Sequence, residues 1–405
     1  MKLAIIGAGP SGMFAALNAK TSTNEVYLFE KNKFLGKKLL ITGGGRCNIT
    51  NNSKNQFFSD NIINGKKFLH SSLSQFSNFD LIKFLERHGI KLYSQGNKIF
   101  PKSQNSKEIL NLLIDLLKEK GIKIITETEI EEISFSDFFI LKTNLGVMNF
   151  DKVLIATGGF SHQETGSTGD GYRFSKKFGH SIFPLKPALS SILVKNSFVK
   201  NISGVSLKNV EVFIKEKNKR ISEFGDVVFT FNGISGPAVL NISSKINRKK
   251  FDKIYIDLYP QMNNEDILKK FNFIVKEKIN MNIKNILKSV ITESMLDIIL
   301  KKSGVDKNKK GNQITKEEKN MIIHTLKFFD LDFLNFNKIN FATVTSGGVN
   351  LKEINPKTME SKLKKNLYFA GEVMNIDALS GGFNLQLAFS TGFVAGINMG
   401  ENNER

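Results

Sequence analysis

The sequence predicts an α/β protein in which a discontinuous parallel-sheet domain is interrupted by a β-rich domain and a small helical domain. Three observations predict this organisation. Short apolar runs followed by helical patterns fill the first part of the chain and return after Thr343. Between them, apolar residues alternate from about residue 190 to 260 and then recur every three or four positions. The expected domains are residues 1–187 plus 335–405, residues 188–260 and residues 261–334.

Individual elements of the first domain follow from local patterns. Lys2–Ile6 is a short apolar run, typical of a buried parallel strand, and an Ala-rich helix follows it to about Lys20. Glu25–Glu30 predicts a second strand that ends in an acid. The further expected elements are helices over Phe79–His88, Ser106–Lys120 and Leu385–Ile397, strands over Gly89–Tyr93, Lys123–Thr128 and Val153–Ala156, and a hairpin over Phe138–Thr143 and Val147–Phe150.

The two insertions differ in the period of their apolar residues. The alternating segments predict strands over Ile192–Val194, Leu207–Ile214, Asp226–Phe229 and Lys253–Leu258. Apolar residues spaced three or four apart predict helices over Ile267–Val275, Ile283–Leu300 and Glu317–Phe329. The polar segment Lys301–Lys319 is expected to be a solvated loop.

Composition excludes several classes of protein. The chain has 405 residues, one cysteine and no tryptophan. A single cysteine excludes a disulfide framework and a Cys-rich metal centre, and the five histidines show no metal-ligand spacing. No apolar run approaches the roughly eighteen residues of a transmembrane helix. We therefore expect a cytoplasmic protein without a metal ion or a membrane partner, and the oligomeric state stays open.

The charge of the chain is strongly positive and unevenly distributed. There are 58 Lys and Arg residues against 38 Asp and Glu, a net charge of +20. Such a balance is typical of proteins that bind nucleic acid or anionic membranes, although AT-rich codon usage also enriches lysine. Residues 1–120 hold 18 basic and 8 acidic residues, and residues 188–330 hold 26 and 15. Residues 121–187 hold 7 and 8, and residues 331–405 hold seven of each. Because codon bias acts on every segment, the uneven distribution favours a functional cause.

A glycine fingerprint follows the first predicted strand. Gly7, Gly9 and Gly12 form the pattern GxGxxG between that strand and the following helix, and Glu30 closes the next strand. In this context Gly7 permits a tight turn, Gly9 lets a pyrophosphate approach the backbone, and Gly12 allows close helix–strand packing. Glu30 is placed to accept hydrogen bonds from a ribose. These residues predict a Rossmann-type dinucleotide-binding domain.

Further glycine-rich segments carry candidate ligand contacts. Three consecutive glycines end at Gly45 and are followed by Arg46 and Cys47, and this flexible backbone can wrap a flat or anionic ligand. Arg46 is one of few arginines, and its planar fork suits a phosphate or a carbonyl. Later strands end at Gly158 and at Gly371-Glu372, where small residues permit close contact with a cofactor. Gly382 precedes Asn384 at the start of an apolar helix whose N-terminus favours negative charge.

The order of these motifs resembles the YhiN-like (BaiN-like) flavoprotein family nearly from end to end. The segments that carry the resemblance are Gly7–Gly12, Gly36-Lys37-Lys38, Gly43-Gly44-Gly45-Arg46-Cys47-Asn48, Ala156-Thr157-Gly158-Gly159, Thr165–Tyr172, Gly233–Ala238, Thr345–Val349, Lys357-Thr358-Met359-Glu360-Ser361 and Phe369–Asn384. The resemblance implies bound FAD. It places FAD contacts at Gly7, Gly9, Gly12, Glu30, Lys37, Arg46, Glu372, Gly382 and Asn384.

The resemblance also implies a flavin-dependent oxidoreductase, but family activities differ. Some members are described as reductases of uridine to dihydrouridine in large-subunit ribosomal RNA, and others act on steroid-like enones or oxidise aminoacetone. No second dinucleotide fingerprint occurs, so NAD(P)H would dock transiently at the flavin. The charge distribution favours the RNA reductase, with RNA as partner. A small-molecule flavin oxidase or reductase is the alternative, and a non-catalytic flavin-dependent RNA-binding factor would show the same motifs.

Three residues are candidate catalytic groups. Reduction of uracil needs a hydride at C6, a proton at C5 and stabilisation of negative charge on the conjugated carbonyl. Arg46 is the candidate for the charge, and Cys47 or Tyr172 for the proton. Cys47, as the only thiol, could instead be a small buried residue of the loop.

Overall fold

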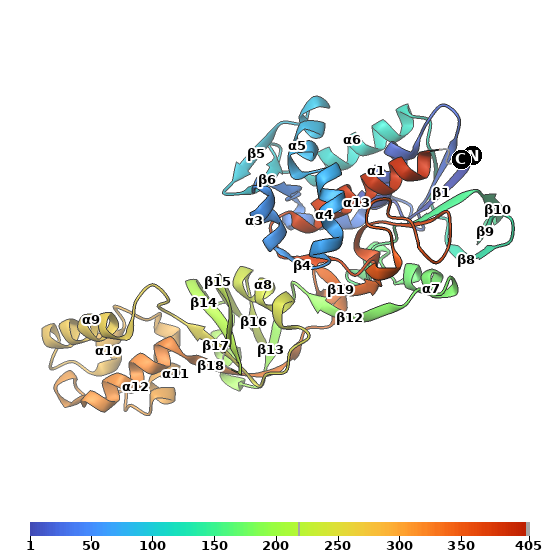
Figure 1. Cartoon of the computed structure of the whole chain (residues 1–405). Helices are drawn as coiled ribbons and strands as arrows, with labels where there is room; N and C mark the ends of the chain where they lie inside the picture. Colours follow the sequence, from blue (N-terminus) through green and yellow to red (C-terminus); the bar gives the residue numbers. More distant parts are fainter. Residues whose placement is uncertain (218, 402–405) are drawn as a thin grey trace. The chain divides into compact units, whose positions relative to one another are not determined.

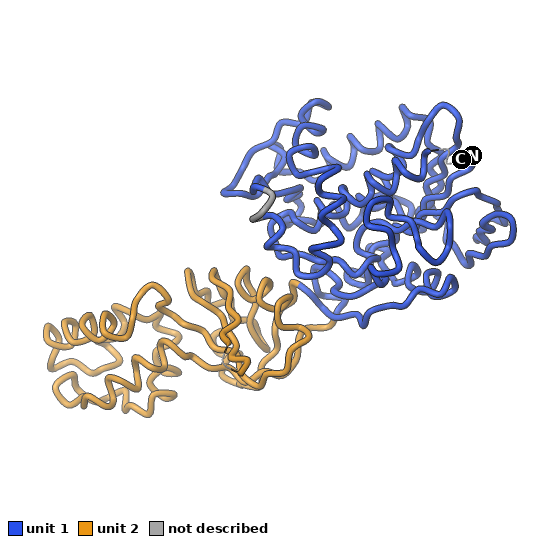
Figure 2. Tube along the Cα trace, in the orientation of Figure 1, with its two compact units in different colours: residues 1–188, 339–405 blue, residues 189–338 orange. Residues whose placement is uncertain are grey.

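The computed structural model describes residues 1–217 and 219–401, and at residues 55–57 the backbone. The chain forms two compact units, coloured separately in Figure 2. Unit 1 comprises Met1–Ala188 and Ile339–Arg405, and unit 2 comprises Leu189–Lys338. None of the described helices is long and apolar enough to cross a membrane.

A five-stranded parallel sheet forms the centre of unit 1 (Figure 1). Its strands are buried apolar runs, which is the pattern of a sheet covered on both faces. In spatial order they are β20 (Leu367–Phe369), β11 (Lys152–Ile155), β1 (Lys2–Ile6), β2 (Glu25–Phe29) and β7 (Lys123–Ile125). Because β1, β11 and β20 are neighbouring parallel strands, their carboxyl ends lie side by side at one edge of the sheet, although the strands come from distant parts of the sequence.

Two helices pack against each other beside this sheet through small residues. They are α1 (Pro10–Ala19) and the C-terminal α13 (Phe383–Gly400). A Cβ atom at any of three glycines of α13, spaced four apart, would lie 2.4–2.5 Å from a carbonyl oxygen of α1; the pairs are Gly392 with Ser11, Gly396 with Ala15 and Gly400 with Ala19. Since only glycine allows this approach, these three glycines determine which face of α13 packs against α1.

The rest of unit 1 consists of helices and small antiparallel sheets. The helices are α2 (Lys37–Ile41), α3 (Asn55–Asp60), α4 (Lys66–Gln75), α5 (Asn78–Arg87), α6 (Ser106–Glu119) and α7 (Asp170–Lys177). The sheets pair β3 (Thr50–Asn51) and β5 (Leu92–Gln95) with β6 (Lys98–Pro101), β4 (Ile62–Asn64) with β21 (Asp377–Ala378), β8 (Ile130–Phe135) and β10 (Gly146–Phe150) with β9 (Phe139–Thr143), and β12 (Ile182–Ala188) with β19 (Val344–Val349).

Unit 2 combines a closed six-stranded antiparallel barrel with helices (Figure 1). In order around the barrel the strands are β13 (Ile192–Val194), β16 (Gly233–Ser235), β15 (Lys219–Thr230), β14 (Ser206–Glu216), β17 (Lys253–Asp257) and β18 (Phe329–Phe336). The helices are α8 (Pro237–Ile246), α9 (Asn264–Glu277), α10 (Ile283–Leu287), α11 (Glu293–Ser303) and α12 (Lys316–Lys327). One continuous apolar core joins the barrel to the helices.

The predicted fold class is confirmed, with local corrections. The strand β18, which closes the barrel, comes after the helices, and most of it lies within the segment 261–334 that was predicted as helical. The expected helix over Ile283–Leu300 is two helices, and the expected loop over Lys301–Lys319 includes the end of α11 and the start of α12. The three predicted domain boundaries stay a prediction.

Candidate active site

Two of the three fingerprint glycines are closed in by backbone atoms, and the third faces open space. A Cβ atom at Gly7 would lie 2.5 Å from the carbonyl oxygen of Ala156, and one at Gly12 would lie 1.8 Å from that of Gly7. At Gly9 no heavy atom lies within 4 Å of the Cβ position. Gly9 is the N-cap of α1, and no side chain caps this helix. The amides of the first turn therefore meet a space that suits an anionic phosphate.

Glu30 is held beside this loop. Its Oε2 accepts the N–H of Ala8 at 3.1 Å, and its Oε1 accepts the backbone and side-chain N–H groups of Asn32 at 2.9 and 2.6 Å. Lys37 donates to Oδ1 of Asn32 at 2.9 Å. The carboxylate is thus fixed next to the glycine loop, and Lys37 reaches it through Asn32.

Glu372 lies where four segments of unit 1 meet. Its Oε2 pairs with Nζ of Lys38 at 2.8 Å, and its Oε1 accepts the N–H of Thr345 at 2.8 Å and the hydroxyl of Ser161 at 3.2 Å. Lys38 also donates to Ser161 Oγ at 2.8 Å. Sequence reasoning missed Lys38, Ser161 and Thr345 as partners of Glu372. The pair of adjacent lysines was a signal, but only the fold shows which one faces the acid.

Arg46 presents an exposed guanidinium. It follows Gly43, Gly44 and Gly45, which all have left-handed φ values. Its Nε donates to the carbonyl of Gly43 at 3.3 Å, and its guanidinium carbon lies 5.0 Å from the ring centroid of Phe100. Among the ion pairs of the described residues, none involves Arg46. The charge of this side chain is therefore available to a ligand.

Cys47 is fully buried by the protein's own atoms. Burial raises the pKa of its thiol to about 12, although a hydrogen bond with Thr42 opposes the shift. The residue belongs to the main apolar core of unit 1. This placement favours a small core residue over a group that contacts a substrate.

Two buried hydroxyl groups of unit 1 have no hydrogen-bond partner. They are Oγ1 of Thr157 and the phenol of Tyr172, on α7. Burial, and then the charge of Glu372, raise the pKa of Tyr172 far above its ordinary value. Buried polar groups are almost always paired in native proteins. Unpaired hydroxyls therefore point to a ligand at this place.

Most of the remaining predicted glycines stand where protein atoms leave no room for a Cβ atom. A Cβ atom would lie 2.9 Å from Ser167 Oγ at Gly158, 2.6 Å from Ser11 Oγ at Gly371, and 2.4 Å from the carbonyl oxygen of Thr50 at Gly382. Gly45 differs, because its nearest neighbour lies 4.0 Å away.

Asn384 uses its amide within the protein. Its Oδ1 accepts the N–H of Ala378 at 2.9 Å, and its Nδ2 donates to the carbonyl of the same residue at 2.8 Å. These bonds give Asn384 a positioning role for the segment before α13.

Together these features fit a bound dinucleotide. The open position at Gly9, the uncapped start of α1, the fixed carboxylate of Glu30 and the two unpaired hydroxyls belong to unit 1. No group of three or more His, Cys, Asp or Glu residues in the described part of the chain could hold a metal ion.

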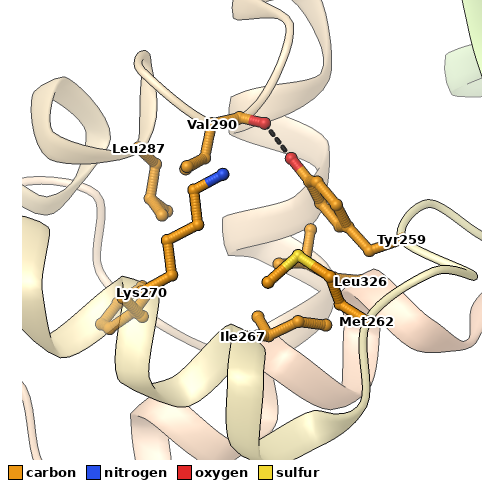
Figure 3. Close-up of a pocket in the computed structure, with 8 residues that line it drawn as sticks. Tyr259, Met262, Ile267, Lys270, Leu287, Val290 and Leu326 are labelled. Atoms are coloured by element: carbon orange, nitrogen blue, oxygen red, sulfur yellow. Dashed lines mark hydrogen bonds between the residues drawn. The ribbon is translucent and has the colours of Figure 1, made fainter.

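A separate pocket lies among the helices of unit 2 (Figure 3). Its lining is almost wholly apolar and includes Tyr259, whose hydroxyl donates to the carbonyl of Val290, and the stem of Lys270. The pocket shares no residue with the motifs of unit 1, so it is distinct from the dinucleotide site.

Curated relatives align over almost the whole chain. A 3-dehydro-bile acid delta(4,6)-reductase of Clostridium scindens is 28% identical over 404 residues, which are 98% of this chain and 98% of that protein. A ribosomal RNA dihydrouridine synthase of Haemophilus influenzae is 28% identical over 406 residues, 98% of this chain and 97% of that one. The Escherichia coli protein of the same name is 28% identical over 390 residues, with 96% and 95% covered.

Solved structures show the same fold at low identity. A Rhodococcus jostii 3-ketosteroid-delta4-(5alpha)-dehydrogenase in complex with 4-androstene-3,17-dione superposes with a TM-score of 0.54 and 10% identity, covering 99% of this chain and 96% of that one. The Mycobacterium smegmatis Sdh1 complex gives a TM-score of 0.50 and 17% identity, covering 98% and 68%.

The family model for the HI0933-like protein Rossmann domain matches residues 1–398. The match confirms the family resemblance of the motifs, and with it the expected cofactor, FAD. The chain therefore belongs to the HI0933-like family and is an FAD-dependent oxidoreductase.

Proposed function

We propose that the protein uses NAD(P)H to reduce a conjugated C=C bond, and that its substrate is a uridine of large-subunit ribosomal RNA. Two of the curated relatives are named ribosomal RNA dihydrouridine synthases. The third is named as a reductase of a bile acid at the same identity. Identity alone does not choose between an RNA and a steroid-like substrate.

The charge of unit 2 carries the choice of RNA. Residues 189–338 contain 27 basic and 16 acidic residues, a net charge of +11. A protein that holds a nucleic-acid backbone needs such an excess, because lysines replace the counterions of the phosphates. A steroid-like substrate would instead need an apolar pocket at the cofactor, and the apolar pocket of unit 2 shares no residue with the cofactor motifs.

The reaction adds two hydrogens to the base. The C5=C6 bond of uracil is conjugated to the C4 carbonyl, so hydride addition at C6 places negative charge on that carbonyl. FAD, when bound and reduced by NAD(P)H, supplies the hydride. A proton then completes the product at C5, and NAD(P)⁺ leaves as the oxidised product. The protein must therefore stabilise the carbonyl charge and deliver one proton.

Arg46 is the proposed group for the carbonyl charge. Its guanidinium is exposed and has no carboxylate partner among the described residues, so it keeps its full charge for a ligand. Tyr172 is the proposed proton donor, because its buried phenol is unpaired. The phenol carries a proton at neutral pH, as an ordinary tyrosine does. The buried thiol of Cys47 is the weaker candidate for that proton.

An anaerobic assay with purified holoenzyme tests the proposal. Enzyme reduced with NADH or NADPH is mixed with large-subunit ribosomal RNA from a host strain that lacks the gene. Reoxidation of the flavin should accompany formation of dihydrouridine, detected by mass spectrometry of the digested RNA. Arg46→Gln should lower kcat by about two orders of magnitude while FAD stays bound, and Tyr172→Phe should slow reoxidation. Reoxidation by RNA without dihydrouridine would contradict the proposal.

The second candidate is a small-molecule flavin enzyme. The bile acid reductase matches 98% of both chains, which favours this alternative over unrelated chemistry. The same reduced enzyme is offered a 3-oxo-4-ene steroid, and the oxidised enzyme is offered aminoacetone with oxygen. Fast turnover of either compound, with none on RNA, would select the small-molecule function.

A further inference from the structure

Unit 2 presents an aromatic ring at a tight turn, and we propose that this ring stacks on an unpaired base of the RNA. The Phe231 turn consists of Thr230–Gly233 and joins β15 to β16. The inference rests on the proposed RNA substrate and names a contact that would hold it.

The turn is short and fixed. Thr230 pairs with Gly233, so Phe231 and Asn232 alone connect the two strands. The carbonyl of Asn232 accepts the N–H of Val194 at 3.1 Å, which ties the turn to β13. Two-residue hairpin turns favour Asn, Asp and Gly. This chain instead places a phenylalanine there, and its side chain is 65% exposed.

One lysine without an acid partner lies beside the ring, and a second follows the residue that is hydrogen-bonded to the turn. Nζ of Lys200 lies 5.2 Å from the centroid of the Phe231 ring. Lys195 directly follows Val194, whose N–H donates to Asn232, and it is exposed. Neither lysine takes part in an ion pair of the described residues. A ring that offers a π face beside free ammonium groups can bind a base and its phosphate together.

A protein partner fits this surface less well. Docking sites for proteins are usually contiguous apolar patches, whereas the Phe231 turn offers one ring beside Lys200. The net charge of +11 on unit 2 also complements a polyanion. Single-stranded RNA is therefore the occupant that the ring and its flanking charges favour.

Phe224 on β15, the strand that leads into the turn, provides a matched control. Its side chain is 51% exposed, and it lies opposite Glu211 in the β14–β15 pair. No cation lies over its ring among the described residues. Loss of this exposed phenylalanine removes a similar apolar surface from the barrel without touching the Phe231 turn.

Binding of a fluorescent single-stranded oligouridine to the FAD-loaded protein tests the proposal. Phe231→Ala should weaken binding about tenfold, because one stacked base contributes on that scale. Phe231→Trp and Phe224→Ala should stay within about twofold of the wild type. Lys200→Gln should lower affinity and reduce the slope of log K against log salt by about 0.7.

Three outcomes would overturn the stacking site. Wild-type affinity in Phe231→Ala would show that the side chain is not used. Wild-type affinity in Phe231→Leu, which keeps apolar bulk without a π face, would show that stacking is not the cause. In both cases, salt-dependent RNA binding and dihydrouridine formation by the wild type would leave the proposed function intact. A wild-type protein that binds no RNA would overturn both proposals.

Discussion

Two adjacent lysines, Lys37 and Lys38, have different partners around the cofactor motifs. Lys37 was expected to contact FAD, and it donates to Asn32. Lys38 forms the ion pair with Glu372, and the two side chains are only 23% and 20% exposed. A partly buried carboxylate that loses its cation keeps its desolvation cost. Lys38 should therefore matter more than Lys37 to the position and charge of Glu372.

Substitution of each lysine by methionine tests this difference. Lys38→Met should weaken FAD binding to the apoprotein by roughly five- to tenfold, about 1 kcal/mol, because Glu372 is left without its cation. Lys37→Met should change the affinity less than about twofold, and Lys38→Arg should restore most of the loss. Fluorescence titration of the apoprotein with FAD measures all three. Equal losses in the two methionine variants would instead support the direct contact at Lys37.

The buried thiol of Cys47 should make the free energy of unfolding depend on pH above about pH 9. Burial raises the pKa of its thiol from 9.0 to about 12. The unfolded chain releases this proton above about pH 9, while the folded chain keeps it. The neutral thiol therefore makes its full contribution to the free energy of unfolding below about pH 9. As the pH rises from there toward about 12, the free energy of unfolding falls by about 1.4 kcal/mol per pH unit.

Cys47→Ala should remove this dependence. The variant should be less stable than the wild type at pH 8, because a buried side chain is lost. The difference should shrink by about 1.4 kcal/mol for each pH unit above about pH 9.5. Urea unfolding at pH 8 and pH 10.5 measures it, and the variant should keep FAD and turnover. Parallel pH profiles would contradict the burial of the thiol, and lost turnover with FAD bound would restore Cys47 as a catalytic residue.

At the scale of elements, the fingerprint glycines have two different roles, because one packs against the backbone and another faces the space for the ligand. Gly12 meets the backbone of Gly7, whereas Gly9 faces open space.

The structure also explains the distinctive segment Lys357–Ser361 as a scaffold. Ser361 Oγ lies 2.8 Å from Nε2 of the buried His180 and accepts two backbone N–H groups of the following turn. This segment thereby supports the approach to β20.

Alanine should destabilise the fold at Gly12 but not at Gly9. Gly12→Ala places a Cβ atom 1.8 Å from a carbonyl oxygen, so it should destabilise the protein by about 3 kcal/mol or more. Gly9→Ala should leave the thermal midpoint of the apoprotein within about 2 °C but weaken FAD binding at least tenfold, because the methyl group enters the ligand space. Calorimetry and FAD titration test the pair. Tight FAD binding by Gly9→Ala would contradict the assignment of this loop.

Patterns with local causes were predictable at this scale. Apolar runs and the glycine spacing located β1, α1 and β2, and the acid at Glu30 lies where the fingerprint requires it. The closure of the barrel by β18 could not be seen, because its partners β13 and β17 lie far away in the sequence. The partners of Glu372 were missed for the same reason, since Lys38, Ser161 and Thr345 meet only through tertiary packing.

At the scale of the molecule, both units carry excess positive charge, and the excess is denser in unit 2, since unit 1 has a net charge of +9 on 255 residues. The predicted cofactor residues all lie in unit 1, while unit 2 has a net charge of +11 on 150 residues. The distribution of basic residues along the sequence predicted the excess in the insertions, and it placed a similar excess in residues 1–120. Composition could not show which lysines are free, because many in unit 2 pair with acids, as Lys284 does with Asp297 and Lys309 with Glu318.

The most direct test of the proposed function is a map of dihydrouridine in ribosomal RNA. Large-subunit RNA is compared between the wild-type host and a strain that lacks the gene, and the RNA of that strain is then treated with holoenzyme and NAD(P)H. If the protein reduces a uridine of ribosomal RNA, dihydrouridine disappears from a defined uridine on deletion and returns on treatment. An unchanged dihydrouridine pattern in the deletion strain, with no gain on treatment, would contradict the proposed function and select the small-molecule alternative.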